Sequence, residues 1–253
     1  MPATFVKRSA DHDSDFYAVE AAGLRWLGAA GANAARVAGV VSVNDRMIEL
    51  ERLEVVRPTR AAAEAFGRAL ATTHAAGAAA YGQPPDGWAG DGYIGQQRMS
   101  LRADDAWGRF YAEQRMLPFA RRAHDIGHLS AAAYALVERV AERLVAGEFD
   151  DERPVARIHG DLWAGNVLFT PDGVVLIDPA AHGGHGLTDL AMLHLFGAPH
   201  LDAITGAYAE AAALSEGWED LIGLHQLHPL LVHAVSHGPS YGSVASRVAE
   251  RYA

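Results

Sequence analysis

Three polar residues around one predicted β-hairpin constrain what this chain can fold into more than any other feature. Asp161 and Asn166 lie five residues apart, and Asp178 follows twelve residues after Asn166. Between the last two, residues 167–169 and 174–177 form short apolar runs that are separated by a Pro-Asp-Gly turn. An antiparallel hairpin of these runs holds Asn166 and Asp178 at its open end. The sequence therefore predicts a polar site whose geometry is set by the hairpin.

The spacing of these residues has a chemical explanation in phosphoryl transfer. Asp161 and Asn166 match the D-x-x-x-x-N pattern of kinase catalytic loops, and Asp178 stands where the metal-binding Asp of such proteins follows. A hydroxyl that attacks a phosphate needs a carboxylate to orient it and accept its proton, which is the role that we expect for Asp161. Mg²⁺ prefers oxygen ligands, which the Asn166 amide and the Asp178 carboxylate supply. The alternative, that these residues only cap loops and turns, explains each of them singly but not the complete spacing.

The remaining chain divides into a short mixed segment and a long helical one. The first segment has strand, helix, strand and strand patterns over residues 4–7, 16–29, 35–43 and 46–53. Beyond it we expect a loop over residues 81–95 and helices over residues 59–76, 104–123, 130–146 and from 188 to the C-terminus. We predict an α+β protein with a two-lobed, protein-kinase-like fold, in which residues 1–53 form a small β-rich lobe and residues 54–253 a larger helical lobe.

A lysine and a glutamate in the first segment support this interpretation. Lys7 lies on the first predicted strand, and Glu20 lies near the middle of the first predicted helix. A kinase small lobe needs such a lysine for the α- and β-phosphates and a helix glutamate that holds it. By itself the pair is more typical of a solvated lysine on an edge strand and an exposed glutamate on a helix, so its weight comes from the catalytic loop downstream.

The residues named so far belong to longer strings that resemble one family. The chain resembles the fructosamine kinase (ketosamine 3-kinase) family, in the aminoglycoside-phosphotransferase branch of the kinase-like fold, from Phe5 to about Tyr241. The strings that carry the resemblance are FVK, EAAGLRWL, HGDLWAGN, IDPA and DLAMLHLFG. The resemblance implies ATP- and Mg²⁺-dependent phosphorylation of the sugar 3-hydroxyl of ketosamines, in which fructose or ribulose is attached to an amine. The substrate is then a small molecule or a glycated protein, and the process is deglycation.

The resemblance also implies roles for individual residues. It makes Asp161 the base, Asn166 and Asp178 the metal ligands, and Lys7 with Glu20 the pair that positions the phosphates. The hinge whose backbone binds adenine corresponds to Leu50, Glu51, Arg52 and Leu53. Trp163 stands two residues after the base, where protein kinases commonly have lysine, and its flat ring forms either a wall for the acceptor or packing under the loop.

The chain departs from the family pattern in two places. Only six residues precede Lys7, too few for the glycine-rich hairpin that covers the ATP phosphates in family members, so we expect a shortened N-terminus. The Arg-Glu pair that usually precedes the DLAM string is replaced by uncharged residues and a histidine, from His185 to Thr188.

Composition limits the partners of the chain. It holds 21 Lys and Arg against 31 Asp and Glu, for a formal net charge of −10, which disfavours nucleic acids and anionic membranes. It has no cysteine, so disulfides and thiolate chemistry are excluded, and no apolar run approaches the roughly 18 residues of a membrane span. We therefore expect a cytoplasmic protein.

The histidines are abundant but do not complete a metal motif. The pairs His182 and His185, and His233 and His237, have spacings that could chelate a transition metal, yet no Glu completes an HExxH motif and no carboxylate follows either pair at a characteristic distance. We expect His159 to stay neutral and bond to the backbone near the catalytic loop, and His74 to be a buried structural residue.

Two alternatives remain open at the level of sequence. The same fold and catalytic residues could act on another hydroxyl acceptor, such as an aminoglycoside or a choline-like compound. The missing glycine-rich hairpin and Arg-Glu pair would also suit a nucleotide-binding pseudokinase. The sequence does not determine the acceptor or the oligomeric state.

Overall fold

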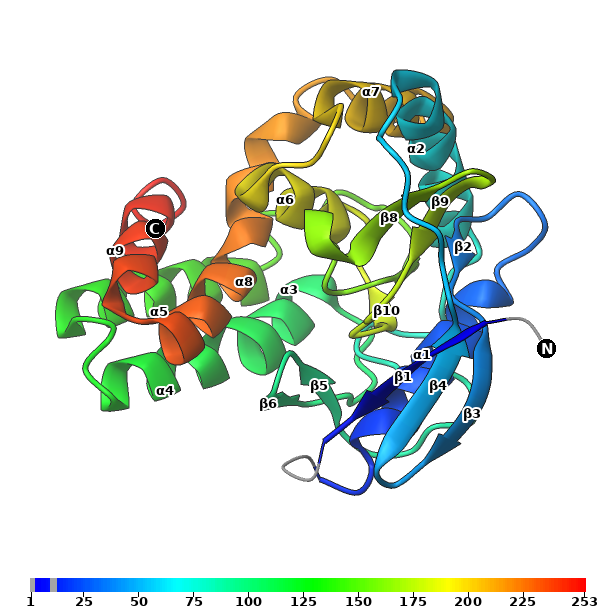
Figure 1. Cartoon of the computed structure of the whole chain (residues 1–253). Coiled ribbons are helices and arrows are strands. Elements are labelled where there is room, and N and C mark those ends of the chain that lie inside the picture. Colours follow the sequence, from blue (N-terminus) through cyan, green and yellow to red (C-terminus); the bar gives the residue numbers. More distant parts are fainter. Residues whose placement is uncertain (1–2, 10–12) are drawn as a thin grey trace.

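The computed structural model describes residues 3–9 and 13–253, and a small sheet with one helix stands apart from a larger helical part (Figure 1). Residues 1–2 and 10–12, inside the predicted first lobe, lie outside the described residues. The sheet has the strand order β1-β4-β3 and is antiparallel, with Lys7 opposite Ile48. Its strands are β1 (Thr4–Arg8), β3 (Val40–Asn44) and β4 (Met47–Glu51), and α1 (Phe16–Gly28) packs against it. The predicted strand–helix–strand–strand order is confirmed.

One predicted strand was wrong in its extent. Residues 35–43 do not form a single strand of this sheet, because β2 (Arg36–Val37) pairs in parallel with β9 (Gly173–Leu176), a strand of the hairpin between Asn166 and Asp178. The Ala38 amide continues this pairing by donating to the carbonyl of Leu176, 2.9 Å away. The first segment is thereby attached to the strand that leads to Asp178.

The catalytic hairpin is formed as predicted. Strands β8 (Val167–Thr170) and β9 (Gly173–Leu176) are antiparallel, and a single 3₁₀ turn (Ala164–Asn166) precedes them. Beside them, β7 (Ala156–Ile158) and β10 (His182–Gly184) pair antiparallel. The predicted helix at residues 59–76 is α2 (Arg60–Ala75), whose first turn is capped by the Thr59 hydroxyl.

The segment predicted as a loop, residues 81–95, ends in the first strand of a hairpin, whose second strand follows directly after it. Strands β5 (Gly92–Ile94) and β6 (Gln97–Met99) form this hairpin. The Tyr93 hydroxyl lies 2.9 Å from Asp13 and 2.6 Å from Asp15, and the Arg98 guanidinium lies 5.2 Å from the Tyr93 ring centre. These contacts join the hairpin to the start of α1, and the Gly- and Pro-rich sequence gave no sign of them.

Helices make up the rest of the chain, and several gather at the end of the molecule away from the sheet (Figure 1). The predicted helix at 104–123 begins later and contains a π-helical stretch, and the segment from residue 188 is four helices. In chain order the elements are α3 (Trp107–Phe110), a π-helix (Tyr111–Met116), α4 (Leu117–Asp125), α5 (Ala131–Val145), α6 (Leu187–Phe196), α7 (Leu201–Ala211), a 3₁₀ turn (Trp218–Leu221), α8 (Ile222–His237) and α9 (Pro239–Ala249). None of the helices in the described ranges is long and apolar enough to cross a membrane.

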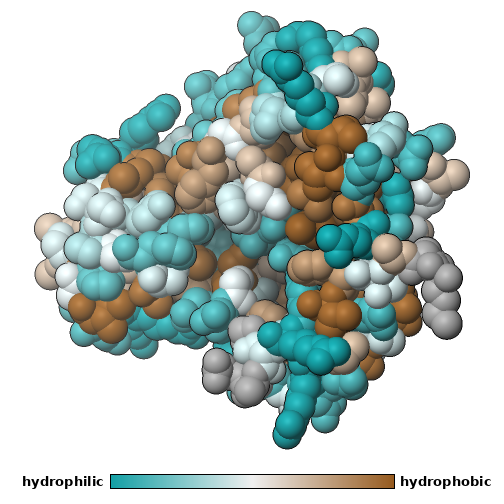
Figure 2. All heavy atoms as spheres, in the orientation of Figure 1, coloured by the Kyte–Doolittle hydropathy of each residue, from teal (hydrophilic) through white to brown (hydrophobic). Residues whose placement is uncertain are grey.

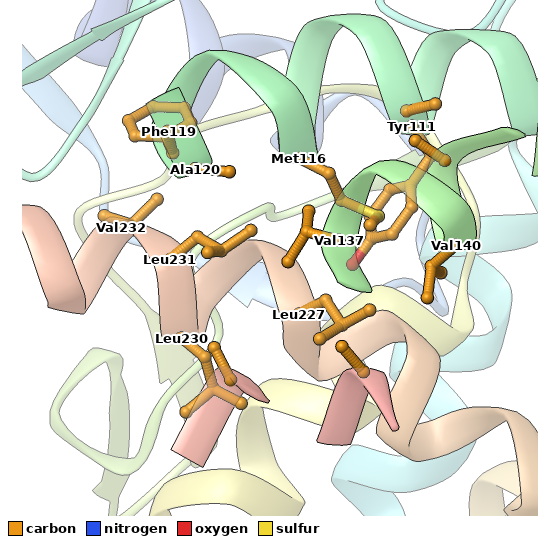
Figure 3. Close-up of a cluster of buried hydrophobic side chains, with 14 of the residues drawn as sticks. Tyr111, Met116, Phe119, Ala120, Val137, Val140, Leu227, Leu230, Leu231 and Val232 are labelled. Carbon is orange, nitrogen blue, oxygen red and sulfur yellow. The ribbon is translucent and has the colours of Figure 1, made fainter. Parts of the chain in front are cut away.

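The main core lies where the π-helix, α4 and α5 meet α8 (Figure 3). Tyr111, Met116 and Leu227 are almost fully buried there. Pro229 interrupts α8 because it lacks an amide proton, which frees the carbonyl of His225. The Tyr111 hydroxyl donates to that carbonyl over 2.8 Å, so the buried tyrosine replaces the missing helix bond. On the surface shown in Figure 2, hydrophilic residues lie along most of the outline of the molecule, and apolar residues form separate patches.

A contact between the buried His185 and the partly exposed Asp151 makes the stability of this fold depend on pH. His185 Nε2 lies 3.1 Å from the Asp151 carboxylate. Burial raises the pKa of Asp151, but the hydrogen bond and charge of His185 outweigh it and hold the pKa below its usual value. A carboxyl with a lowered folded-state pKa stabilises the fold above its unfolded pKa of about 3.9, and this contribution is lost as the pH falls.

We expect Asp151→Ala to lower the free energy of unfolding at pH 7 by about 1 kcal/mol, or the Tm by roughly 2–4 °C. The difference from wild type shrinks between about pH 5 and pH 3. Thermal melts of both proteins across that range check this, and a pH-independent difference would contradict it.

Candidate active site

The catalytic hairpin brings the predicted base and metal ligands together. Asn166 is buried, and its Nδ2 donates to the carbonyl of Asp161 over 2.8 Å and to the Asp161 Oδ2 over 3.3 Å. The same nitrogen lies 3.5 Å from the carbonyl oxygen of Asp178. Because the amide nitrogen is committed to these acceptors, the Asn166 Oδ1 is the end left for a cation.

Lys7 connects this hairpin to the small sheet. Its Nζ lies 2.7 Å from the Glu20 Oε1 and also contacts the Asp178 Oδ1, so β1, α1 and the end of β9 converge on one amine. Burial lowers the pKa of Lys7, but the charges of Glu20 and Asp178 outweigh it and raise the pKa, which keeps the amine charged. Asp178 has a φ of 54°, a left-handed conformation that turns the chain sharply after β9.

Asp161 lies in a setting that favours proton uptake. Burial raises the pKa of its carboxyl to about 7, with the hydrogen bond from Asn166 opposing and the nearby charges of Asp178 and Asp189 adding to the rise. A carboxyl with a pKa near neutrality suits the proton-accepting role that the sequence predicts for Asp161.

Asp189 holds the catalytic loop in place, a role that was not predicted from the sequence. It is fully buried at the first turn of α6. Its Oδ2 accepts the His159 amide and its Oδ1 the Gly160 amide, both over 2.8 Å. His74 Nε2 lies 3.0 Å from Oδ2. Burial raises the pKa of Asp189, but these donors outweigh it and hold the pKa low. A single Asp in an otherwise apolar helix string was the signal available in the sequence.

Two histidines that lie in or beside the catalytic loop behave as the sequence predicts. His74 is buried, with its Nδ1 2.7 Å from the Tyr208 hydroxyl, and has the expected structural role. His159 Nε2 donates to the carbonyl of Ile177 over 2.8 Å, and burial lowers the pKa of its ring, so it is neutral and bonded to the backbone. Gly160 has a φ of 81°, and a Cβ there would lie 2.3 Å from the Ala180 carbonyl oxygen, so glycine is required.

A large cavity of about 1360 Å³ is lined by Lys7, Glu20, Asp161, Asn166 and Asp178. Trp163 lines the same cavity. The Trp163 side chain is 44% exposed, although it is large and apolar. Its ring lies over Gly165, where a Cβ would come within 2.3 Å of the indole. The ring therefore forms part of the cavity wall, and its position depends on the glycine.

The predicted hinge residues lie at the end of β4, the central strand of the small sheet, and just after it, and they do not line this cavity. Leu50 is buried in β4, and Leu53 follows the strand. The backbone amides of Glu51 and Arg52 donate to the carbonyls of Gly39 and Ala3. Adenine binding by this segment stays a prediction.

The position of the absent Arg-Glu pair is filled by a cluster of aromatic and imidazole rings with one threonine. Thr188 Oγ1 lies 3.0 Å from His225 Nδ1, and the His225 ring stacks on Trp107 with ring centres 4.9 Å apart. His185 packs against the same two rings. Packing and hydrogen bonding therefore connect α6 to α8 and α3 at this position.

The oxygen groups of Asn166 and Asp178 fit Mg²⁺, which commonly takes one or two protein ligands and completes its shell with phosphates and water. Within residues 3–9 and 13–253, no group of three His, Asp or Glu side chains is arranged to hold a metal ion by itself. The donor set is thus suited to a metal that arrives with a phosphate ligand.

Comparison with known proteins identifies the family. The fructosamine kinase family model matches residues 2–253. The chain belongs to the fructosamine kinase family. A solved structure named as a fructosamine-3-kinase, from Thermobifida fusca, is 46% identical, with a TM-score of 0.90 over 98% of this chain and 85% of that one. A protein named as a ketoamine kinase, from Lactiplantibacillus plantarum, is 30% identical over 98% of this chain and 86% of its own length.

More distant structures of the family's neighbours show the fold alone. A spectinomycin phosphotransferase shares 13% identity with a TM-score of 0.60, over 98% of this chain and 86% of that one. The predicted two-lobed α+β kinase-like fold is confirmed, and this fructosamine kinase family protein is a kinase.

Proposed function

We propose that this chain transfers the γ-phosphoryl group of ATP to the sugar 3-hydroxyl of a ketosamine, and so acts in deglycation of small molecules or glycated proteins. The observation that carries the proposal is the convergence of Lys7, Asp161, Asn166 and Asp178 in one cavity, from elements as far apart as β1 and β9. The family membership supplies the substrate class.

The geometry suggests how each residue acts. Asp161 orients the acceptor hydroxyl and accepts its proton as the oxygen bonds to the γ-phosphorus and the bond to the leaving oxygen of ADP breaks. Lys7, held by Glu20, binds the α- and β-phosphates. Asn166 and Asp178 would hold Mg²⁺, which would supply positive charge against the phosphates. Asp189 keeps Asp161 in position through the loop backbone.

Three further assignments belong to the same proposal. Residues 1–53 and 54–253 form the two lobes on either side of the nucleotide. Leu50, Glu51, Arg52 and Leu53 bind adenine as the hinge. Trp163 forms one wall for the sugar, because its exposed flat face lies in the cavity that holds Asp161.

The test is phosphate incorporation from labelled ATP into fructosyl-lysine and ribulosyl-lysine, with an aminoglycoside and a choline-like alcohol as competing acceptors. We expect phosphorylated ketosamine and little product from the others. Preferred phosphorylation of another alcohol would replace the acceptor in this proposal. Stabilisation by ATP and Mg²⁺ in a thermal melt without turnover of any acceptor would indicate a pseudokinase.

The wall formed by Trp163 gives a separate prediction. Gly165→Ala places a methyl group within 2.3 Å of the indole, so the ring has to move. We expect the KM for the ketosamine to rise roughly five- to tenfold while the KM for ATP is unchanged. The matched control is Gly206→Ala on α7, where a Cβ meets nothing within 4 Å. Steady-state kinetics with both substrates decide, and an unchanged acceptor KM would mean that Trp163 does not contact the sugar.

A further inference from the structure

The wall of the cavity contributed by α6, α8 and α9 is built from rings. Phe196, His233, His237 and Tyr241 line it. The centre of the His233 ring lies 4.8 Å from that of Phe196, 4.9 Å from that of His237 and 5.1 Å from that of Tyr241. His233 and His237 stack at 22°, one helical turn apart on α8. The result is a connected surface of four rings in the cavity that holds Asp161.

The hydrogen bond of His233 fixes which of its nitrogens carries the proton. Its Nδ1 lies 2.8 Å from the carbonyl oxygen of Pro229, and a carbonyl can only accept, so Nδ1 donates. Burial lowers the pKa of His233, with the Pro229 bond opposing and His237 adding to the lowering, so the ring is neutral. In a neutral ring with the proton on Nδ1, Nε2 is a lone-pair acceptor.

His237 is held in the same tautomer by a different contact. Its Nδ1 lies 2.8 Å from the Ser236 hydroxyl. That hydroxyl has one proton, which it donates to the carbonyl of Val232 over 2.9 Å. Ser236 therefore accepts from His237 Nδ1, and in the neutral ring the Nε2 of His237 is a second acceptor.

The surface therefore offers two acceptor nitrogens and several aromatic faces. Among the described residues lining the cavity, the charged ones lie on β1, α1 and the catalytic hairpin, and they are Lys7, Arg8, Glu20, Asp161 and Asp178. An ammonium group needs hydrogen-bond acceptors and favours the faces of aromatic rings. A ligand with one weakly hydrated ammonium group fits such a wall better than a ligand with several. The wall has no carboxylate that would offset the combined charge of several ammonium groups.

A transition metal is the other species that takes imidazole Nε2 lone pairs. The His233 and His237 pair supplies two ligands, whereas protein zinc sites use three or four. Within the described ranges no third His, Asp or Glu joins them. The chemistry of the wall favours the ammonium.

We propose that His233 and His237, with the rings of Phe196 and Tyr241, form the subsite that binds the protonated amine of the acceptor, and so select substrates with one amine beside the sugar. This rests on the proposed function for the identity of the acceptor. The subsite recognises the amine through hydrogen bonds that the histidines accept and through the faces of the aromatic rings. A polyamine would instead need a site that is rich in carboxylates.

The experiment compares substitutions that keep the ring with substitutions that keep the acceptor atom. His233→Phe and His237→Phe retain the stacking and lose Nε2, whereas His237→Gln retains an acceptor. Acceptors are a ketosamine and the corresponding 1-deoxyketose, which has the hydroxyls and no amine. His194→Phe is the control, because His194 is an exposed histidine on α6 outside the cavity lining.

We expect each Phe variant to raise the KM for the ketosamine about tenfold, with kcat and the KM for ATP little changed, and His237→Gln to restore most of the loss. The KM for the 1-deoxyketose stays unchanged in all variants. A parallel rise in both acceptor KM values would assign the histidines to the sugar and overturn the subsite, as would no change in either. Binding of Zn²⁺ alone that is lost in the Phe variants, with ketosamine KM unchanged, would assign the pair to a metal.

Calorimetric titration of the ketosamine without ATP separates this inference from the proposed function. If no ketosamine is phosphorylated but the ketosamine binds wild type about tenfold more tightly than His233→Phe, the function fails and the subsite stands. Equal affinity of the two proteins for the ketosamine overturns the subsite whatever the turnover. Thermal melts of each variant establish that the fold is retained.

Discussion

Asp161→Asn is expected to lower kcat by about 10³-fold, within the 10²- to 10⁴-fold range typical of a lost general base. The substitution keeps the size of the side chain and removes its ability to take the proton of the acceptor hydroxyl. The loop should survive, because Asn166 also bonds to the backbone carbonyl of Asp161, which the substitution leaves in place. Removing a carboxylate that lies close to Asp178 and Asp189 also relieves repulsion among buried charges.

The measurement is steady-state phosphorylation together with a thermal melt in ATP and Mg²⁺. We expect the nucleotide-dependent rise in Tm to match that of wild type, since Lys7, Asn166 and Asp178 are unchanged. Asp172→Asn is the matched control, because Asp172 is exposed in the turn of the same hairpin. A kcat of Asp161→Asn within a few fold of wild type would remove Asp161 from the role of base.

Local spacing explains why the centre of the site could be predicted from the sequence. Asp161, Asn166 and Asp178 lie within 18 residues of one another, on a hairpin whose strands and turn have strong sequence signals. The contact of Lys7 with Asp178 joins residues 171 positions apart, and the sequence did not predict it. The helix and strand patterns identified β1, α1, α2 and α5 because each has the period of its structure.

The parts that the sequence did not reveal depend on tertiary contacts. The β5–β6 hairpin is tied by Tyr93 and Arg98 to carboxylates about 80 residues away, which no local pattern encodes. Strand β2 has two residues, and its pairing with β9 needs the hairpin to be in place first. The ring wall around His233 combines residues from three helices. The sequence shows each of these residues, but it does not show that they lie side by side.

The buried anchor of the catalytic loop should have an effect of a different kind from that of the base. Asp189→Asn replaces one carboxylate oxygen, a hydrogen-bond acceptor, by an amide NH₂ group, which is a donor. This NH₂ group then faces a group that donated to the oxygen in the wild type. At least one buried donor, among the amides of His159 and Gly160 and the ring of His74, then loses its acceptor. Breaking such a buried charged network costs about 3–5 kcal/mol.

We therefore expect Asp189→Asn to lower the free energy of unfolding by about 3 kcal/mol and kcat by about 10²-fold, because Asp161 is no longer held at its position. Denaturant unfolding and kinetics below the lowered Tm measure the two effects separately. The comparison with Asp161→Asn is decisive, since that variant loses kcat with its stability retained, whereas Asp189→Asn loses both. Asp189→Asn with wild-type stability and turnover would show that the loop holds its geometry without the carboxylate. If the loss of turnover persisted in a stabilising background that restored the Tm, positioning of Asp161 would be the cause, because a purely structural role would be rescued together with the fold.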